Sequence, residues 1–332
     1  NIKLEKKTYF SEEDMKKKIL VLFSILILAL SLSAIGVSAA NIASGTCANG
    51  MTWYINDSGT LKITGTGDME NYGSDVDTVA PWRTYYSSIN NIVISTGITH
   101  IGDCAFSNLS NVTKVTLSST VTSIGDYAFE DCTSLATVKF PEGLTSIGSC
   151  AFYNCDALTE ITIPKSVTSF GGGSSFAWCS GLKKVTLLTD APLSYNTFAH
   201  CDKLEKVDAP EGVRFSKGSA FYYCKNLKYI SVSSKQLTIN SGTFSGCESL
   251  EYIIFLGNNS GYSDLGKIET YAFSGCDALE KIYYTGSKQG WNSVTKESKG
   301  NEKLLSATVV YRGTLFFNIG SSDSGTMKSL SA

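Results

Sequence analysis

The sequence predicts a β-rich α/β fold, a solenoid in which short repeats stack so that each buries the apolar face of the next. Two observations carry this prediction. The phrase SIGDYAFEDCTSL, which starts at Ser123, returns as SIGSCAFYNCDAL at Ser146. In addition, four apolar positions keep one register through eight successive units. Ordinary core patterning does not produce such a register, so the period defines the architecture.

The phenylalanine of the repeat sets the register. Successive phenylalanines lie 22 to 24 residues apart, with a final step of 29, at Phe106, Phe129, Phe152, Phe176, Phe198, Phe221, Phe244 and Phe273. The position three residues later is Leu109 in the first unit and cysteine in all others, at Cys132, Cys155, Cys179, Cys201, Cys224, Cys247 and Cys276. Leucine or valine follows at six residues, and valine or isoleucine at nine.

Each unit predicts one strand and one tight turn. In the stretch 158–164, Ile161 and Ile163 alternate with polar residues, which is the pattern of a half-buried strand. Pro164 ends this strand because proline cannot donate a hydrogen bond to the sheet. The SIGDYAF half of the unit predicts a bend followed by a short helical turn. One such unit cannot cover its own apolar face, but a stack of them can.

The amino-terminal segment predicts export. Met15 begins a basic stretch of three lysines, an apolar run follows over 19–32, and Val37-Ser38-Ala39 offers a cleavage site. This is the arrangement of a secretory signal peptide over 15–40, and an uncleaved anchor helix is the alternative. Residues 1–14 are interpreted as upstream sequence or a fragment edge.

The repeat resembles the BspA-like leucine-rich repeats of the LRR_5 type, whose phrase SIGxxAFxxCxxLxxVxIP it follows. The resemblance covers roughly residues 45–312. It implies a right-handed, curved leucine-rich-repeat solenoid with a parallel sheet on its concave face and capping segments at both ends. The implied division is a β-rich amino-terminal cap over 41–97, about eight repeats over 98–284, a carboxy-terminal cap over 285–312, and a linker or truncated tail over 313–332.

The seven repeat cysteines predict a column of buried thiols. Equivalent residues of adjacent coils lie about 4.8 Å apart, beyond the usual Cβ separation of about 3.5–4.5 Å in a disulfide. Free cysteine packs as a small hydrophobe, and its thiol can form a weak hydrogen bond to a turn backbone. A metal array is the alternative, but a linear column lacks the tetrahedral arrangement that such an array needs.

The sequence contains no recognisable catalytic motif. His200 precedes Cys201, which allows a Cys–His dyad, but Cys201 is one of seven equivalent column members. The sequence has no GxSxG elbow and no GxxxxGK[ST] loop. The net charge of −2, without a basic stripe, argues against nucleic acid and anionic lipid as partners. We therefore expect no enzyme, no cofactor, no metal site and no membrane insertion after signal cleavage.

The exposed strand positions predict a binding surface. They fall eight and ten residues after each phenylalanine. In the last three coils they include Tyr229, Tyr252, Ile254 and Tyr283, which we expect to form a ligand-binding cluster on the concave face. If the strands stack in register, Tyr229 and Tyr252 lie about 5 Å apart. The alternative is that the tyrosines are ordinary strand residues that pack on each other.

Together these features predict a non-catalytic protein, secreted or at the surface of a bacterial cell, that is monomeric and serves adhesion. The expected partner is a protein or glycoprotein of a host or neighbouring cell. The alternative is a carbohydrate-recognition module of a larger extracellular, polysaccharide-handling protein, with tyrosines stacking on sugar rings.

Overall fold

A computed structural model describes residues 40–47, 50–73, 79–257 and 264–311. The chain divides into two units, Asn1–Ala40 and Asn41–Ala332, and all the elements below belong to the second. The predicted signal peptide lies outside the described residues except for Ala40. The whole predicted tail over 313–332 also lies outside them, as do residues 258–263 of the insertion after Gly257.

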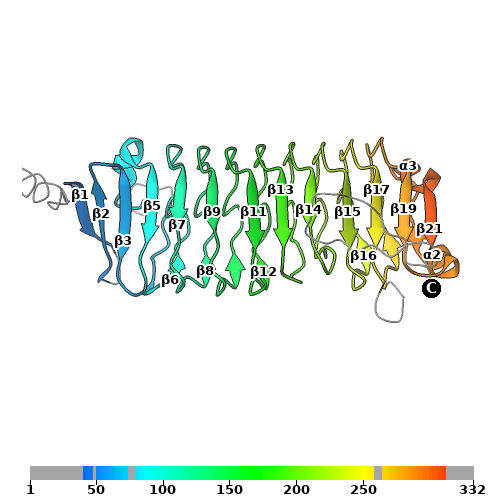
Figure 1. Ribbon diagram of the computed structural model, residues 1–332, viewed down its shortest axis with the longest axis horizontal. Helices are drawn as coiled ribbons and strands as arrows, with labels where there is room; N and C mark the ends of the chain where they lie inside the picture. Colours follow the sequence, from blue (N-terminus) through cyan, green and yellow to red (C-terminus); the bar gives the residue numbers. More distant parts are fainter. Residues whose placement is uncertain (1–39, 48–49, 74–78, 258–263, 312–332) are drawn as a thin grey trace, which may run out of the picture. The chain divides into compact units, whose positions relative to one another are not determined.

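Long strands form one row along the solenoid, and its regular part is parallel (Figure 1). The first sheet of this row contains β1 (Asn41–Thr46), β2 (Thr52–Asn56), β3 (Thr60–Thr64), β5 (Asn91–Ile94), β7 (Lys114–Thr116) and β9 (Thr137–Lys139). The second contains β11 (Glu160–Ile163), β13 (Lys184–Leu187), β14 (Lys206–Asp208), β15 (Tyr229–Val232), β17 (Tyr252–Phe255), β19 (Lys281–Tyr284) and β21 (Thr308–Tyr311). Among the strands that the structure describes, only β1–β2 and β2–β3 pair antiparallel.

Shorter strands form a second side of the coils. One sheet contains β4 (Gly67–Asp68), β6 (Ile98–Ile101), β8 (Ser123–Ile124), β10 (Ser146–Ile147) and β12 (Ser169–Phe170). The other contains β16 (Thr238–Ile239), β18 (Lys267–Ile268) and β20 (Thr295–Lys296). The described helices are η2 (Arg83–Ser88), α2 (Lys288–Ser293) and α3 (Glu302–Ser306). The predicted solenoid with parallel strands is therefore confirmed.

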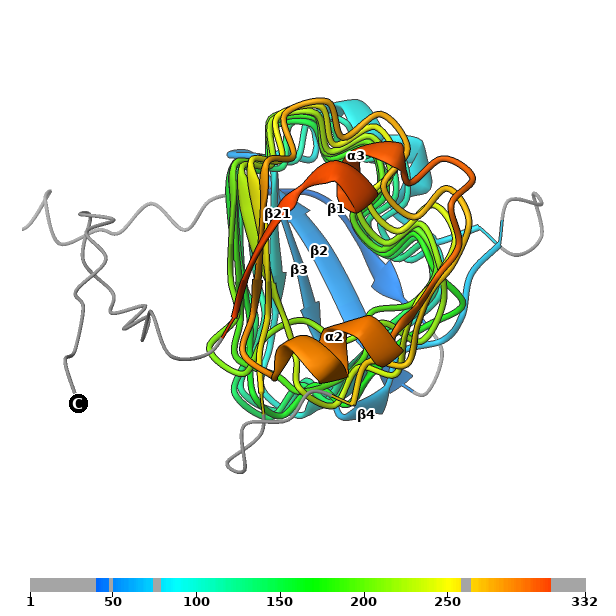
Figure 2. The ribbon, with the colours of Figure 1, turned by 90° about the vertical axis from the view of Figure 1, so that its right-hand side faces the viewer.

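The register is one residue to one residue between neighbouring coils, so chemically equivalent residues become spatial neighbours. Lys114 pairs with Thr137 in the first sheet, and Tyr229 pairs with Tyr252 in the second. Viewed along the coils, successive turns superpose closely (Figure 2). Every residue type in a fixed slot of the repeat therefore forms a row along the solenoid.

The phenylalanine slot forms the centre of the core. All eight rings are almost completely buried, with at most 1% exposure. Neighbouring rings stack with centroid separations between 5.1 Å, for Phe129 and Phe152, and 6.0 Å, for Phe221 and Phe244. Trp82 continues the stack into the amino-terminal cap, 5.5 Å from Phe106, and its indole N–H donates to the carbonyl of Ala105. Burial of large aromatic rings against each other is a major stabilising term of this fold.

The segment around each phenylalanine is a run of turns rather than the helical turn we expected. Its backbone bonds reach back three residues, as from Leu109 N–H to the Phe106 carbonyl. In every unit the residues two before and two after the phenylalanine have positive φ, so the chain cannot continue as a helix. The slot two residues after the phenylalanine, here called the turn slot, holds Asn108, Asp131, Asn154, Trp178, His200, Tyr223, Gly246 and Gly275.

Candidate ligand-binding surfaces

The long strands present polar side chains to solvent on what we call the strand face. Its amino-terminal half carries Lys114, Thr137, Lys139 and Glu160, all exposed. In the middle, the carboxylate of Asp208 lies 3.1 Å from the Lys206 ammonium and 3.6 Å from that of Lys184. These pairs are partly exposed and contribute little to stability, but they fix the charge pattern of the surface.

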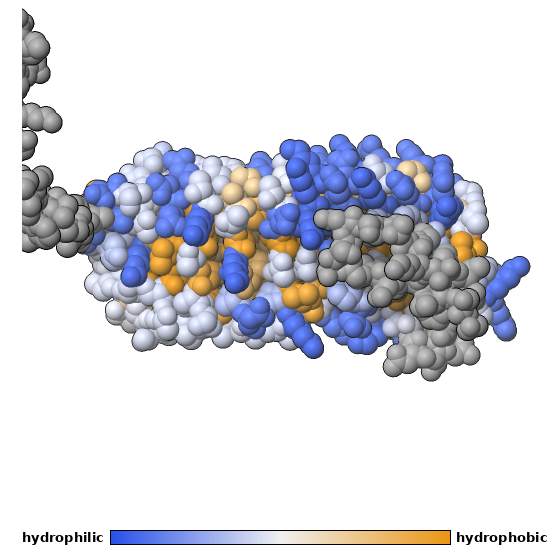
Figure 3. Space-filling view, in the orientation of Figure 1, coloured by the Kyte–Doolittle hydropathy of each residue, from blue (hydrophilic) through white to orange (hydrophobic). Residues whose placement is uncertain are grey.

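Two adjoining depressions cross the strand face at β7, β9 and β11, and together we call them the strand groove. Their volumes are about 650 and 350 Å³, and both are lined by Thr137, Val138, Lys139, Phe140 and Glu142. Figure 3 shows apolar residues gathered over these strands, with polar residues around them. The sequence did not single this groove out, because alternation predicts polar strand positions without showing how much of the apolar layer stays accessible.

The predicted tyrosine cluster exists, but its exposure differs from our prediction. The rings of Tyr229 and Tyr252 stack with centroids 5.2 Å apart and an interplanar angle of 3°, which confirms the expected spacing. Both side chains are half-buried. The expectation that Ile254 and Tyr283 face water is wrong, since they are only 3% and 6% exposed.

Neighbouring strands explain this difference. Tyr283 lies between Ile254 of β17 and Val310 of β21, so the sheet continues past it. Its ring also makes an edge contact with Tyr252, 5.5 Å between centroids. Ile254 in turn is flanked by Ser231 and Tyr283. Tyr283 stands between Ile254 and Val310, and Ile254 lies beside the Tyr283 ring, so both positions contribute to packing. Burial also raises the pKa of Tyr252 to about 12.

The repeat cysteines form a continuous column of free, fully buried thiols. Each thiol donates a hydrogen bond to the carbonyl oxygen of the phenylalanine one coil earlier, over 3.1 to 3.3 Å. Burial raises the pKa of six of them, to about 12 for Cys132 and Cys276. All seven hydrogen bonds connect a coil to its predecessor.

The opposite edge of the coils, here called the turn face, carries aromatic side chains in three consecutive turn slots. Trp178 stacks on His200 with ring centroids 4.0 Å apart, and His200 stacks on Tyr223 at 5.3 Å. The row ends at Gly246, where a Cβ atom would meet the Tyr223 ring at 3.1 Å. Trp178 is 46% exposed, although the three other tryptophans of the chain are at most 6% exposed.

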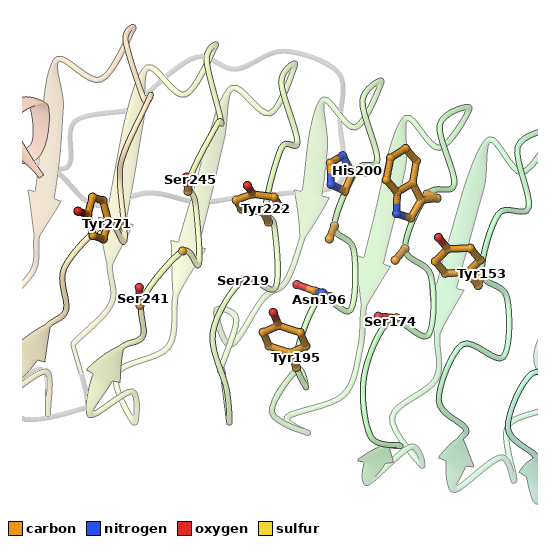
Figure 4. A pocket seen from close by; sticks show the side chains of 14 residues that line it. Tyr153, Ser174, Tyr195, Asn196, His200, Ser219, Tyr222, Ser241, Ser245 and Tyr271 are labelled. Atoms are coloured by element: carbon orange, nitrogen blue, oxygen red, sulfur yellow. The ribbon is translucent and has the colours of Figure 1, made fainter. Parts of the chain in front are cut away.

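A groove of about 710 Å³ runs beside this row, and we call it the turn groove (Figure 4). His200 lies on one wall, and Tyr195 and Asn196 lie on the other. Trp178, which also lines the groove, stacks on His200. Hydroxyl groups continue the lining at Ser174, Ser219, Ser241 and Ser245. None of its 14 lining residues is Asp, Glu, Lys or Arg.

The imidazole of His200 belongs to this aromatic row. Burial lowers its pKa and Lys225 adds to that effect, while Asp202 opposes it. Cys201 is fully buried, and its thiol donates to the Phe176 carbonyl. The imidazole stacks on rings while the thiol is bonded within the core, so their observed partners do not form a dyad. Across the described ranges, no three His, Cys, Asp or Glu side chains group so as to hold a metal ion.

The sequence profile described as "BspA type Leucine rich repeat region (6 copies)" matches residues 83–191 and 172–295, which together make up more than half of the chain. The chain therefore belongs to the BspA-type leucine-rich-repeat family, as its resemblance predicted. Leucine-rich-repeat families are generally non-enzymatic. Within the part of the chain that the structure describes, no helix is long and apolar enough to span a membrane.

Solved structures with similar chains are also leucine-rich-repeat proteins. One from Eubacterium ventriosum shares 25% identity over 73% of this chain and 84% of its own, with a TM-score of 0.43. One from Bacteroides ovatus shares 23% sequence identity over 79% of this chain and 77% of its own, with a TM-score of 0.48. A leucine-rich cell surface protein from Faecalibacterium prausnitzii shares 21% sequence identity over 77% of this chain and 98% of its own, with a TM-score of 0.32. No curated protein matches the chain.

Proposed function

We propose that this chain is a non-catalytic binding protein, secreted or displayed at the cell surface, that holds a protein or glycoprotein partner on its strand face. The observation that carries the proposal is the strand groove. It combines an apolar floor at Val138 and Phe140 with surrounding Lys, Thr and Glu side chains. Protein interfaces share this arrangement of an apolar centre and a polar rim.

Rigidity supports the same proposal. The groove is built on strands β7, β9 and β11. β7 pairs in register with β5 and β9, and β11 pairs in register with β13, while β9 and β11 are the adjoining edges of two sheets. A surface fixed by strands loses little conformational entropy when it binds a partner, which favours affinity. Export through the signal peptide over 15–40 would bring this surface to the extracellular partners of an adhesion protein.

The test is binding of residues 41–332 to a mixed array of extracellular-matrix proteins, host glycoproteins and free glycans. A groove variant carries Thr137→Arg with Lys139→Glu, both at exposed positions of β9. We expect it to lose about tenfold or more in affinity for a protein partner. The control, Lys203→Glu, repeats the charge reversal of Lys139→Glu at an exposed residue outside both grooves and should bind like the parent.

A second variant addresses the tyrosines. Tyr229→Ala with Tyr252→Ala removes the stacked pair on the strand face. If this variant loses binding to free glycans, and no protein on the array is bound, the carbohydrate-recognition module is the better assignment. Undiminished protein binding by the groove variant would overturn the strand groove as the site.

A further inference from the structure

The turn slot imposes a backbone conformation that aromatic residues rarely adopt. Trp178, His200 and Tyr223 have φ values of 64°, 58° and 57°. The other units place Asn, Asp or Gly in this slot, the residues that tolerate left-handed conformation best. Unfavourable backbone conformations that persist tend to gather at functional sites. Three such residues lie in consecutive coils, and two of them, Trp178 and His200, line the turn groove.

We propose that the turn groove is a binding site for a neutral oligosaccharide. Its two walls offer aromatic rings, and its length offers serine hydroxyls, the Asn196 amide and tyrosine hydroxyls. An uncharged sugar ring has the matching chemistry, since its C–H faces pack on aromatic faces and its hydroxyls exchange hydrogen bonds with polar groups. The volume of about 710 Å³ suits a ligand of that size.

The shape of the groove follows from the slot that comes directly after each phenylalanine. This slot holds Tyr153, Ala177, Ala199 and Tyr222 in four successive coils. The two alanines leave room between the tyrosines, and coil steps of about 4.8 Å make this room three steps long. Such a length accommodates a short chain of sugar units rather than a single one.

Ring faces are available where the ligand would lie. Tyr195 is 49% exposed, and no aromatic ring of the described residues stacks on it. Trp178 is stacked on His200 by one face and is still 46% exposed. The stacked rings of Trp178 and His200 therefore form one wall, which Tyr223 supports by stacking on His200, and the exposed ring of Tyr195 lies on the other wall.

Charge separates this ligand class from others. The bases of nucleic acid also stack on aromatic rings, but proteins that bind it place basic residues along its phosphate backbone. No Lys or Arg lines this groove. Acidic sugars would meet the same lack of cations. A proline-rich peptide docks in aromatic grooves as well, and it is an outcome of the test. The turn groove shares no lining residue with the strand groove, so the oligosaccharide proposal is independent of the function proposed above.

Trp178 provides the readout because the three other tryptophans are buried. We would titrate residues 41–332 with neutral xylo-, manno-, cello- and malto-hexaoses, with an oligogalacturonide, and with a proline-rich peptide, following tryptophan emission. Affinity electrophoresis in the corresponding neutral polysaccharides is the second measurement. We expect a saturable change with one neutral oligosaccharide, no response to the acidic one, and retardation in the matching gel.

The variants use residues that the solenoid already accepts in the same slots. Tyr195→Ser introduces the residue that two other coils carry in the same slot, at Ser149 and Ser241. Trp178→Asn introduces the residue that another coil carries in its turn slot, at Asn154. Both variants should therefore fold. Each should weaken retardation about tenfold or more, whereas Tyr127→Ser, at an exposed tyrosine outside the groove, should leave it unchanged. No response to any neutral sugar in either measurement, binding of the proline-rich peptide alone, or affinity within twofold for Tyr195→Ser would overturn the proposal.

Discussion

The thiol of Cys155 donates a hydrogen bond to the carbonyl oxygen of Phe129, 3.3 Å away in the preceding coil. The same contact recurs in all seven cysteine-bearing coils. Because donor and acceptor are both buried, losing one partner leaves the other without a hydrogen bond in an apolar environment. The column therefore stabilises the stack in a way that a general hydrophobe in this slot would not.

Cys155→Ser should destabilise the fold by about 1–3 kcal/mol, since the smaller, more polar hydroxyl is buried in a site shaped for sulfur. Urea denaturation measures the change. Cys150→Ser in the same coil is the matched control, because Cys150 is only half-buried. We expect the control to shift the free energy of unfolding by less than about 0.5 kcal/mol. Equal midpoints for the two variants would contradict the role of the column.

The column thiols should be reduced and unreactive in the folded protein. Burial raises the pKa of six of them, so little nucleophilic thiolate forms there at neutral pH, and all seven are fully buried. Native alkylation should modify only Cys47, Cys104 and Cys150, which are half-buried. Denaturing alkylation without reductant, followed by intact mass, should count at least seven free thiols. Three or more disulfides among the column cysteines would contradict this prediction.

Stability should fall steeply in alkaline solution. An unfolded cysteine ionises near pH 9.0, but the pKa of Cys132 is raised to about 12 in the fold. Between these values the unfolded chain releases protons that the folded chain retains, so rising pH favours unfolding. Each such thiol contributes a slope of about 1.4 kcal/mol per pH unit. Urea midpoints measured at pH 8 and pH 10 test this, with Cys132→Ala expected to reduce the difference.

Tryptophan emission should report the protonation of His200. Protonated imidazole quenches indole fluorescence, and the two rings lie 4.0 Å apart. Burial lowers the pKa of His200, so the quenching transition should be centred below pH 6.5, the usual value for histidine. Stability contributed by the neutral imidazole is present above that pH and is lost as pH falls through the lowered pKa. His200→Asn should abolish the transition, and a transition centred above pH 6.5 would contradict the assignment.

The repeat itself could be predicted because each fixed slot meets the same environment in every coil. The phenylalanine, cysteine and leucine slots are buried throughout, and the strands lie where alternation placed them. The exposure of Tyr283 could not be predicted, because it depends on pairing with Val310 of β21 across a break in the period. The signal for the turn groove was visible as Trp178, His200 and Tyr223 in one slot. Its meaning required the positive φ of that slot and the alanines beside it.

The bond between each thiol and the preceding coil also bears on how the molecule resists force. Every such contact joins only neighbouring coils, so tension applied at one end loads the outermost coil first. That coil can peel away while the next remains intact, and each repeat of about 23 residues then releases about 80 Å of chain. A solenoid built in this way would lengthen stepwise under shear, as an extensible tether.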